Sequence, residues 1–421
     1  MNIQELESVY TRLPQVSAVV DLLGKSSVKT IFLEGLLGSS SSMLFGCLAP
    51  RVKAPLLFIL QDAEEAGYFY HDLTQLLGNR DVLFFPSSYR RSIKYAQRDA
   101  ASEILRTEVL ARLSADSQES SALYIVTYPE ALAEMVVSKQ ALDTRTLVLE
   151  KDQTIAVSEI ETTLRGFGFK EVDYVYEPGQ FALRGSILDV YSYSCEYPYR
   201  IDFFGDDIDS IRTFEVEDQL SKDRRDRIEI VPELAVTTEN KEPFLSFVPR
   251  QVVLVVKDYL YVRDAIDRAY QEGFSSQARL EQLEAATEME QREIEHQFRK
   301  ESQLITGAQF MTDAETFRRV EFGHRPSSQS QATVRFNITT QPLFHKNFEL
   351  LTKAFDDYLL QGYRIFVLAD SQKQNERLKE ILTSADPSKG GERPQTEVFT
   401  PVDKTLHEGF VDDDLRVCVY L

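Results

Sequence analysis

Cysteine is scarce in this chain, and its placement excludes several kinds of site. The 421 residues contain three cysteines, Cys47, Cys195 and Cys418, and none belongs to a CxxC pair. With three cysteines far apart in the sequence, we expect free thiols in a reducing compartment rather than a metal site or a disulfide. The five histidines are scattered without an HExxH pair, and no Gly-x-Ser-x-Gly elbow occurs. The sequence therefore predicts neither a metal site nor a catalytic residue.

Long hydrophobic runs are also missing. No apolar stretch reaches the roughly 18 residues that are needed to span a bilayer. The first residues, Met1–Glu5, are polar and acidic, unlike the start of a secretory signal. We therefore expect a cytoplasmic protein with no membrane partner.

Positive charge is in short supply. The chain has 47 Lys and Arg residues against 67 Asp and Glu residues, for a formal net charge of -20. Neutralising DNA phosphates needs clustered lysine and arginine, so this balance argues against a surface that holds DNA by itself. It leaves room for a small basic patch, and it fits better with protein partners that have basic faces.

One short segment has the composition of such a patch. Its basic and aromatic side chains are Tyr89, Arg90, Arg91, Lys94, Tyr95 and Arg98. Basic and aromatic side chains together can bind single-stranded DNA. A run of this length is more often a solvated loop with charges at a helix start, and we prefer that interpretation.

The segment that most suggests a ligand-binding site lacks the lysine that such a site needs. A phosphate loop has the form G-x-x-x-x-G-K-[ST]: backbone N–H groups cradle the phosphates, and the lysine reaches the β and γ phosphates. The segment after the expected strand Thr30–Leu33 starts this pattern, but serine replaces the second glycine and the lysine; the residues concerned are Gly35, Gly38, Ser40, Ser41 and Ser42. Without a cation at Ser41, the γ-phosphate has no compensating charge. The pattern alone leaves two interpretations open, a degenerate phosphate loop and a simple glycine turn.

The order of the expected strands predicts more than one domain. Strands and helices alternate at the start of the chain, which is typical of a parallel sheet. Within 141–220 the strands are short and follow one another across turns, which indicates a small α+β insert with an antiparallel sheet. A last αβ unit ends on the apolar run Arg416–Leu421 without a cap or turn, so we expect the chain to belong to a longer protein.

Two motifs in the insert resemble a known family. The first is Glu177–Tyr191, which contains Arg-Gly followed by Ser-Ile-Leu-Asp, and the second is Tyr199–Phe214, which begins Tyr-Arg-Ile-Asp-Phe-Phe. Both resemble the UvrB-homology module of bacterial transcription-repair coupling factors, and they match that family better than UvrB itself. Phe85–Tyr89 and His407–Asp412 are similar to the same family, so the resemblance covers essentially the whole chain.

The resemblance implies an architecture. The fold class is α/β, with a RecA-like P-loop parallel-sheet domain, an inserted small α+β domain and a further small α/β domain. Residues 1–140 would be UvrB-like domain 1a with the degenerate phosphate loop, and 221–325 would be its remainder, 1b. Residues 141–220 would be the inserted UvrA-binding domain 2, and 326–421 a third small domain, truncated at its end.

The resemblance also implies a function. The N-terminal region of this family recruits the nucleotide-excision-repair protein UvrA to stalled RNA polymerase. Later domains bind RNA polymerase and move along double-stranded DNA, using ATP and magnesium. This chain would end before those domains, so we expect a binding platform without catalysis or a cofactor. The alternative is an active, ATP-dependent damage-binding protein of the UvrB type.

Five residues of the insert are candidates for the UvrA contact. Arg184 occupies the Arg-Gly position with which the family contacts UvrA, and the others are Lys170, Tyr191, Arg200 and Arg212. Arginine forms bidentate pairs and is common at interface hot spots. The insert also supplies many carboxylates, so for Arg200 and Arg212 we prefer a pair within the domain. For Arg184 the family resemblance favours the interface.

Overall fold

The structure is a computed structural model with three connected bodies, which we call the main body, the small body and the third body. It describes residues 3–79, 81–88, 99–114, 123–234, 241–274, 287, 304–328, 330–342, 344, 347–369, 371–384 and 398–421. The basic and aromatic segment at 89–98 lies outside the described residues. Among the described helices, none is long and apolar enough to cross a membrane.

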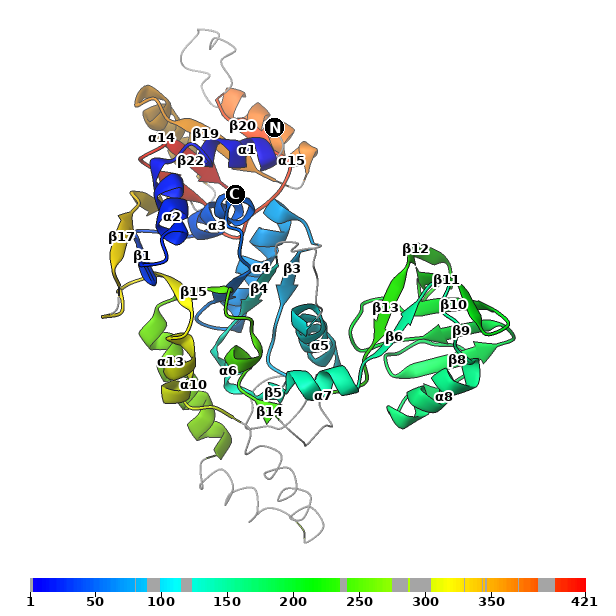
Figure 1. Cartoon of the computed structure of the whole chain (residues 1–421). Helices are drawn as coiled ribbons and strands as arrows, with labels where there is room; N and C mark the ends of the chain where they lie inside the picture. The colour runs from blue at the N-terminus through cyan, green and yellow to red at the C-terminus, as the bar shows by residue number, and fades with distance from the viewer. Residues whose placement is uncertain are drawn as a thin grey trace.

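The main body is built on a seven-stranded sheet in which every pair of neighbouring strands is parallel (Figure 1). The strand order is β17-β1-β16-β15-β2-β4-β3. In that order the strands are Ala332–Arg335, Thr30–Glu34, Arg318–Phe322, Val253–Lys257, Leu56–Ile59, Tyr124–Thr127 and Val82–Phe84. The central strands are short apolar runs buried along their length, as a sheet covered on both faces requires. The predicted α/β class with a parallel sheet is therefore confirmed.

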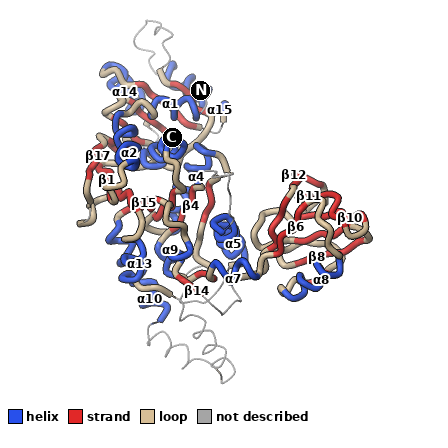
Figure 2. The backbone as a smooth tube through the Cα atoms, in the orientation of Figure 1, coloured by secondary structure: helices blue, strands red, loops and turns tan. Residues whose placement is uncertain are grey.

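Helices alternate with these strands and bury the sheet (Figure 2). They are α1 (Ile3–Tyr10), α2 (Pro14–Gly24), α3 (Ser40–Leu48), η1 (Ala49–Arg51), α4 (Ala63–Leu77), α5 (Ala100–Ser114), α6 (Pro129–Ala133), α9 (Phe244–Phe247), α10 (Tyr259–Phe274) and α13 (Gly307–Ala314). Helix α4 begins where the acidic sequence predicts, because the Asp62 carboxylate accepts a hydrogen bond from the Glu65 N–H at 2.9 Å. Aromatic rings from α3, β2 and α4 meet in the core, where Phe45 and Phe58 lie 5.2 Å apart edge to face.

The small body follows α7 (Lys139–Thr144) in the chain. The strands before and after it, β5 (Val136–Val137) and β14 (Lys241–Glu242), pair with each other. It contains a six-stranded sheet of order β12-β11-β10-β9-β8-β7 and a second pair of strands, β13 with β6. Its elements are β6 (Leu147–Glu150), α8 (Val157–Gly166), β7 (Lys170–Glu171), β8 (Gln180–Arg184), β9 (Ile187–Val190), β10 (Tyr199–Phe204), β11 (Asp207–Phe214), β12 (Ser221–Arg225) and β13 (Arg227–Ile230). Its buried residues form a hydrophobic cluster of their own. Figure 1 shows this body standing to one side of the main body.

The third body has a five-stranded sheet of order β18-β21-β22-β19-β20. Its elements are β18 (Ile338–Thr340), α14 (Phe348–Leu360), β19 (Arg364–Leu368), α15 (Gln372–Ser384), β20 (Thr400–Val402), β21 (Phe410–Asp412) and β22 (Val417–Tyr420). One face of this sheet has its own cluster, which includes Phe355. The other face contributes Phe366, Leu406 and Phe410 to the core of the main body. The third body therefore packs directly on the main body.

The structure does not test the predicted domain boundaries. It does add two observations near them. Strand β13 pairs with β6, so the pairing of the small body continues past residue 220. Strand β17 pairs with β1 at the edge of the main sheet, although its sequence follows the serine-rich stretch Gly323–Gln331.

Candidate functional site

The phosphate-loop segment lies between β1 and α3, in the place where such a loop occurs. Gly35 and Gly38 have φ values of 91° and 53°, in the region that favours glycine. The Leu37 N–H donates to the Ser40 hydroxyl at 3.0 Å, and the Ser41 hydroxyl donates to the Gly38 carbonyl at 3.3 Å. Each of these serine hydroxyls therefore has a partner within the loop itself.

A buried carboxylate on α4 lies beside this loop. Asp72, 1% exposed, accepts hydrogen bonds from the Ser42 hydroxyl at 2.9 Å and from the Ser39 hydroxyl. It also accepts from the backbone N–H of His407, in the third body, at 2.7 Å. Burial raises the pKa of Asp72 above its usual range, and these three hydrogen bonds oppose that rise. In an intact phosphate loop, the residue at the position of Ser42 binds magnesium. Here the Ser42 hydroxyl donates a hydrogen bond to the carboxylate of Asp72 instead.

The third body covers the loop directly. The Ser39 N–H donates to the carbonyl of Glu408 at 3.2 Å, and the Glu408 N–H donates back to the Ser39 hydroxyl at 2.9 Å. A side-chain carbon added at Gly38 would lie 3.2 Å from the Gly409 carbonyl oxygen. The rings of Tyr68 and His407 stack beside this contact. The segment Leu406–Gly409 is thus in van der Waals and hydrogen-bond contact with the loop.

A second polar group lies at the same edge of the main sheet. Asp258 follows β15 with a φ of 50°, an uncommon value for a residue other than glycine. Its carboxylate accepts from Gln61 Nε2 at 2.6 Å and from the His324 N–H at 2.6 Å, and it contacts His324 Nδ1 at 2.9 Å. A side-chain carbon at Gly323 would lie 2.5 Å from this carboxylate, so glycine is required there. This cluster is at the carboxyl edge of the strands, where open α/β sheets bind ligands.

In the small body, two of the five candidate residues meet on one buried carboxylate. Asp189 is fully buried and accepts from Arg200 Nε at 2.7 Å and Nη2 at 2.8 Å, and Arg184 Nη2 forms an ion pair with the same group. Arg184 also donates to the Asp173 carbonyl at 2.9 Å, and its guanidinium lies 4.7 Å from the centre of the Tyr174 ring. The Arg184 side chain is still 33% exposed, whereas that of Arg200 is 14% exposed. Arg184 is therefore the better placed of the two to contact a partner.

The other three candidates do not bind Asp189 in the described contacts, although Arg212 lies directly opposite Arg200 in the pairing of β10 with β11. Arg212 pairs with Asp202 at 2.5 Å across β10 and β11. The Tyr191 hydroxyl donates to the Glu196 carbonyl at 2.5 Å, and burial raises the pKa of Tyr191 to about 12. Lys170 is exposed on β7, which is one edge strand of the sheet, and β12 is the other edge strand. The geometry alone does not test whether any of these five residues contacts UvrA, so that role stays a prediction.

The small body has exposed aromatic side chains, of which Tyr174 contacts Arg184 and Tyr176 lies beside Gln180 at the start of β8. Tyr174 and Tyr176 are 51% and 60% exposed, and Phe204 is 83% exposed. Phe204 belongs to the same end of the sheet as Arg184, because the neighbouring Phe203 N–H donates to the Ser186 carbonyl at 2.8 Å. Aromatic side chains and arginine are the residue types that dominate the energetics of protein interfaces.

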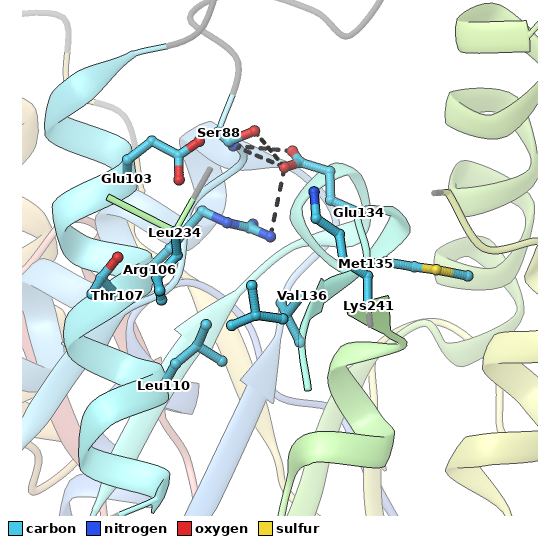
Figure 3. A pocket seen from close by; sticks show the side chains of 11 residues that line it. Ser88, Glu103, Arg106, Thr107, Leu110, Glu134, Met135, Val136, Leu234 and Lys241 are labelled. Atoms are coloured by element: carbon cyan, nitrogen blue, oxygen red, sulfur yellow. Dashed lines mark hydrogen bonds and ion pairs between the residues drawn. The ribbon is translucent and has the colours of Figure 1, made fainter. Parts of the chain in front are cut away.

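A polar pocket lies where the main body leads into the small body (Figure 3). Glu134 accepts from the Ser87 hydroxyl at 2.5 Å and from the Ser88 hydroxyl at 2.6 Å, and Arg106 lies 3.5 Å away. Arg106 also donates to the Pro86 carbonyl at 2.8 Å. These buried groups satisfy one another, as a structural network should. Among the described residues, no group of three or more His, Cys, Asp and Glu side chains is arranged to hold a metal ion.

Comparison with known proteins identifies the relationship of the chain. Residues 147–235 match the UvrB interaction domain, and this range begins at β6 and ends just after β13. The chain is 30% identical to the transcription-repair-coupling factor of Bacillus subtilis over 216 residues, and 26% identical to that of Escherichia coli over 197 residues. The chain is a relative of the transcription-repair-coupling factors. The family resemblance that its two insert motifs indicate is therefore confirmed.

The similarity to the transcription-repair-coupling factors is partial on both sides. It covers 51% of this chain and 18% of the Bacillus subtilis protein, and 47% of this chain and 17% of the Escherichia coli protein. A relative from Myxococcus xanthus is 27% identical over 54% of this chain and 19% of its own length. The chain thus spans less than a fifth of the length of these relatives.

No pattern in the sequence indicates that several of these residues belong to the site. The carboxylate of Asp72 lies in an ordinary amphipathic helix, and its partner His407 is 335 residues away. The backbone strain at Asp258 follows a strand whose sequence is unremarkable for a buried strand. The phosphate-loop pattern points to the glycines of the loop, but the peptide groups that contact the loop come from the third body.

Proposed function

We propose that this chain is part of a transcription-repair coupling factor and that it recruits UvrA through the small body. The observation that supports this most is the match of 147–235 to the UvrB interaction domain, because that range coincides with a body that has its own sheet and core. The relatives are coupling factors by name, which supports a role in transcription-coupled DNA repair. The protein would act in the cytoplasm, where its partners work.

The geometry around Arg184 is suited to binding a protein. Asp189 and the Asp173 carbonyl hold its guanidinium in place before a partner arrives, so little side-chain entropy remains to be lost on binding. Tyr174 supports one face of the guanidinium and is itself half exposed. An arginine packed against a partly exposed aromatic side chain is the kind of anchor that dominates an interface.

The main body acts as a scaffold in this proposal. Ser41 replaces the lysine of a phosphate loop, and the Ser39 N–H already donates to Glu408. Both features oppose ATP binding. The phosphates of ATP need a nearby cation to balance their charge and free backbone N–H donors to hold them. In the complete protein, ATP-driven movement along double-stranded DNA and the contact with RNA polymerase would come from other parts of the chain.

A competition experiment tests the proposed partner. The chain should bind purified UvrA in a surface-immobilised assay, and an excess of UvrB should displace it, because both would present a related body to the same surface of UvrA. The control is bovine serum albumin in place of UvrB at the same concentration. Binding to UvrA that UvrB leaves unchanged would contradict the shared docking surface.

The alternative function, an ATP-dependent damage-binding protein of the UvrB type, makes the opposite prediction about nucleotide. We expect isothermal titration of this chain with ATP and magnesium to give no binding heat, because the loop lacks a cation and its donors are engaged. A UvrB protein titrated in the same buffer is the positive control. An isotherm with a Kd tighter than about 1 mM would favour the alternative.

A further inference from the structure

The phosphate loop is in contact with protein atoms in the very place where its ligand would lie. In an intact loop, the backbone N–H groups before the helix point toward phosphate oxygens. Here the N–H of Ser39, the residue immediately before α3, donates to the carbonyl oxygen of Glu408 at 3.2 Å. A phosphate oxygen and this carbonyl cannot occupy the same position.

Hydrogen bonds are donated in both directions across this contact, which distinguishes it from incidental packing. The N–H groups of two successive residues, His407 and Glu408, donate to Asp72 at 2.7 Å and to the Ser39 hydroxyl at 2.9 Å. Asp72 in turn holds the hydroxyls of Ser39 and Ser42. Three groups thus bind one short peptide segment: the Ser39 N–H, the Ser39 hydroxyl and the Asp72 carboxylate.

Packing and charge act in the same direction. Gly38 leaves just enough room for Gly409, whose carbonyl oxygen would lie 3.2 Å from an added side-chain carbon, and the Glu408 side chain lies against the same position. Leu406 and Phe410, on either side of the segment, are buried in the core of the main body. The carboxylates of Asp72 and Glu408 place negative charge where a phosphate would bring more of it.

We propose that the segment Leu406–Gly409 of the third body is the resident ligand of the former phosphate loop. The site formed by Gly38, Ser39, Ser42 and Asp72 binds a peptide backbone instead of a nucleotide, and this contact fastens the third body to the main body. The third body thereby gains a role, since it closes the site from which the lysine is missing. This inference does not depend on the partner of the small body.

Hydrogen–deuterium exchange on the whole chain tests the proposal. The two side-chain acceptors are removed together in Ser39→Ala/Asp72→Ala, and exchange of the His407 and Glu408 amides should rise by about tenfold or more. The matched control is Ser41→Ala, whose hydroxyl bonds only to the Gly38 carbonyl among the described contacts and should leave these two amides unchanged. Amides of β15, a buried strand of the main sheet, report whether the main body of each variant is folded.

A second measurement keeps the proposal falsifiable if the double variant is poorly folded. Inorganic pyrophosphate is added to the unmodified chain and to Ser41→Lys, which restores the missing cation. If Leu406–Gly409 fills the site, pyrophosphate should not protect the amides of Gly38–Ser42 in either protein. Protection of those amides in Ser41→Lys, or exchange at His407 and Glu408 as fast as in an unfolded peptide, would overturn the proposal.

Discussion

Replacing Asp189 with asparagine is expected to destabilise the small body by about 3 kcal/mol or more. This carboxylate is fully buried and forms ion pairs with the guanidinium groups of both Arg184 and Arg200. Asparagine keeps the size of the side chain but removes the charge, and it turns one acceptor oxygen into a donor that faces Arg200. Two arginines would then share an uncharged partner inside the domain, which is the costly case for a buried ion pair.

The measurement is chemical denaturation of the whole chain, followed by a signal from the small body. Amide hydrogen exchange of β9 and β10 at each denaturant concentration supplies this signal, whereas tyrosine fluorescence would not, because the main and third bodies also contain tyrosines. Asp209→Asn is the matched control, since Asp209 is an exposed residue on β11 of the same sheet. We expect its transition to coincide with that of the unmodified chain. An Asp189→Asn protein that unfolds at the same denaturant concentration as this control would contradict the assignment of Asp189 as the centre of the domain.

The pairing of these residues could be predicted only in part. The many carboxylates of the insert favour an intradomain partner for Arg200 and Arg212, and the structure pairs them with Asp189 and Asp202. Their abundance does not indicate that Arg184 shares Asp189 with Arg200. Such sharing depends on the register of β8, β9 and β10, in which Asp189 faces Arg200 and Ala182. A sequence pattern fixes which face a strand residue occupies, but it does not fix this register.

The fold class follows from the sequence more readily than the site does. Alternating strands and helices predict a parallel sheet because each is a local pattern with its own period. The contact between Ser39 and Glu408 has no local pattern, since 369 residues separate the two. The same holds for β17, whose pairing with β1 brings a late segment to the edge of the first strand. Backbone hydrogen bonds between distant segments leave no trace in side-chain periodicity.

The packing of the third body also explains why the loop is difficult to interpret from its sequence alone. A missing lysine is compatible with a glycine turn and with a degenerate phosphate loop. The structure has both the loop geometry, with positive φ at Gly35 and Gly38, and a protein segment in the ligand position. The absence of a lysine at Ser41 and the peptide contact at Ser39 act in the same direction, because each by itself weakens nucleotide binding.

Arg184→Ala is expected to weaken the binding of UvrA by about 30-fold, or roughly 2 kcal/mol, under the proposed function. Its guanidinium is partly exposed, fixed by Asp189 and supported by Tyr174, so it has the character of a preorganised anchor. The alanine variant should remain folded, because Arg200 still donates two hydrogen bonds to the buried carboxylate. Arg184→Ala therefore tests the contact with UvrA while the small body stays folded. Asp189→Asn cannot do so, because it destabilises the small body itself.

The binding assay uses the whole chain and purified UvrA, with two further variants. Arg224→Ala removes an exposed arginine from β12, several strands away from Arg184 in the same sheet, and should bind as the unmodified chain does. Arg184→Lys keeps the charge but cannot make the planar contacts to Asp189 and Tyr174 together, so it should recover only part of the affinity. Equal affinity for Arg184→Ala and Arg224→Ala would remove Arg184 from the interface. If Arg184→Ala alone fails to bind, the turn at the end of β8 is where the small body meets UvrA.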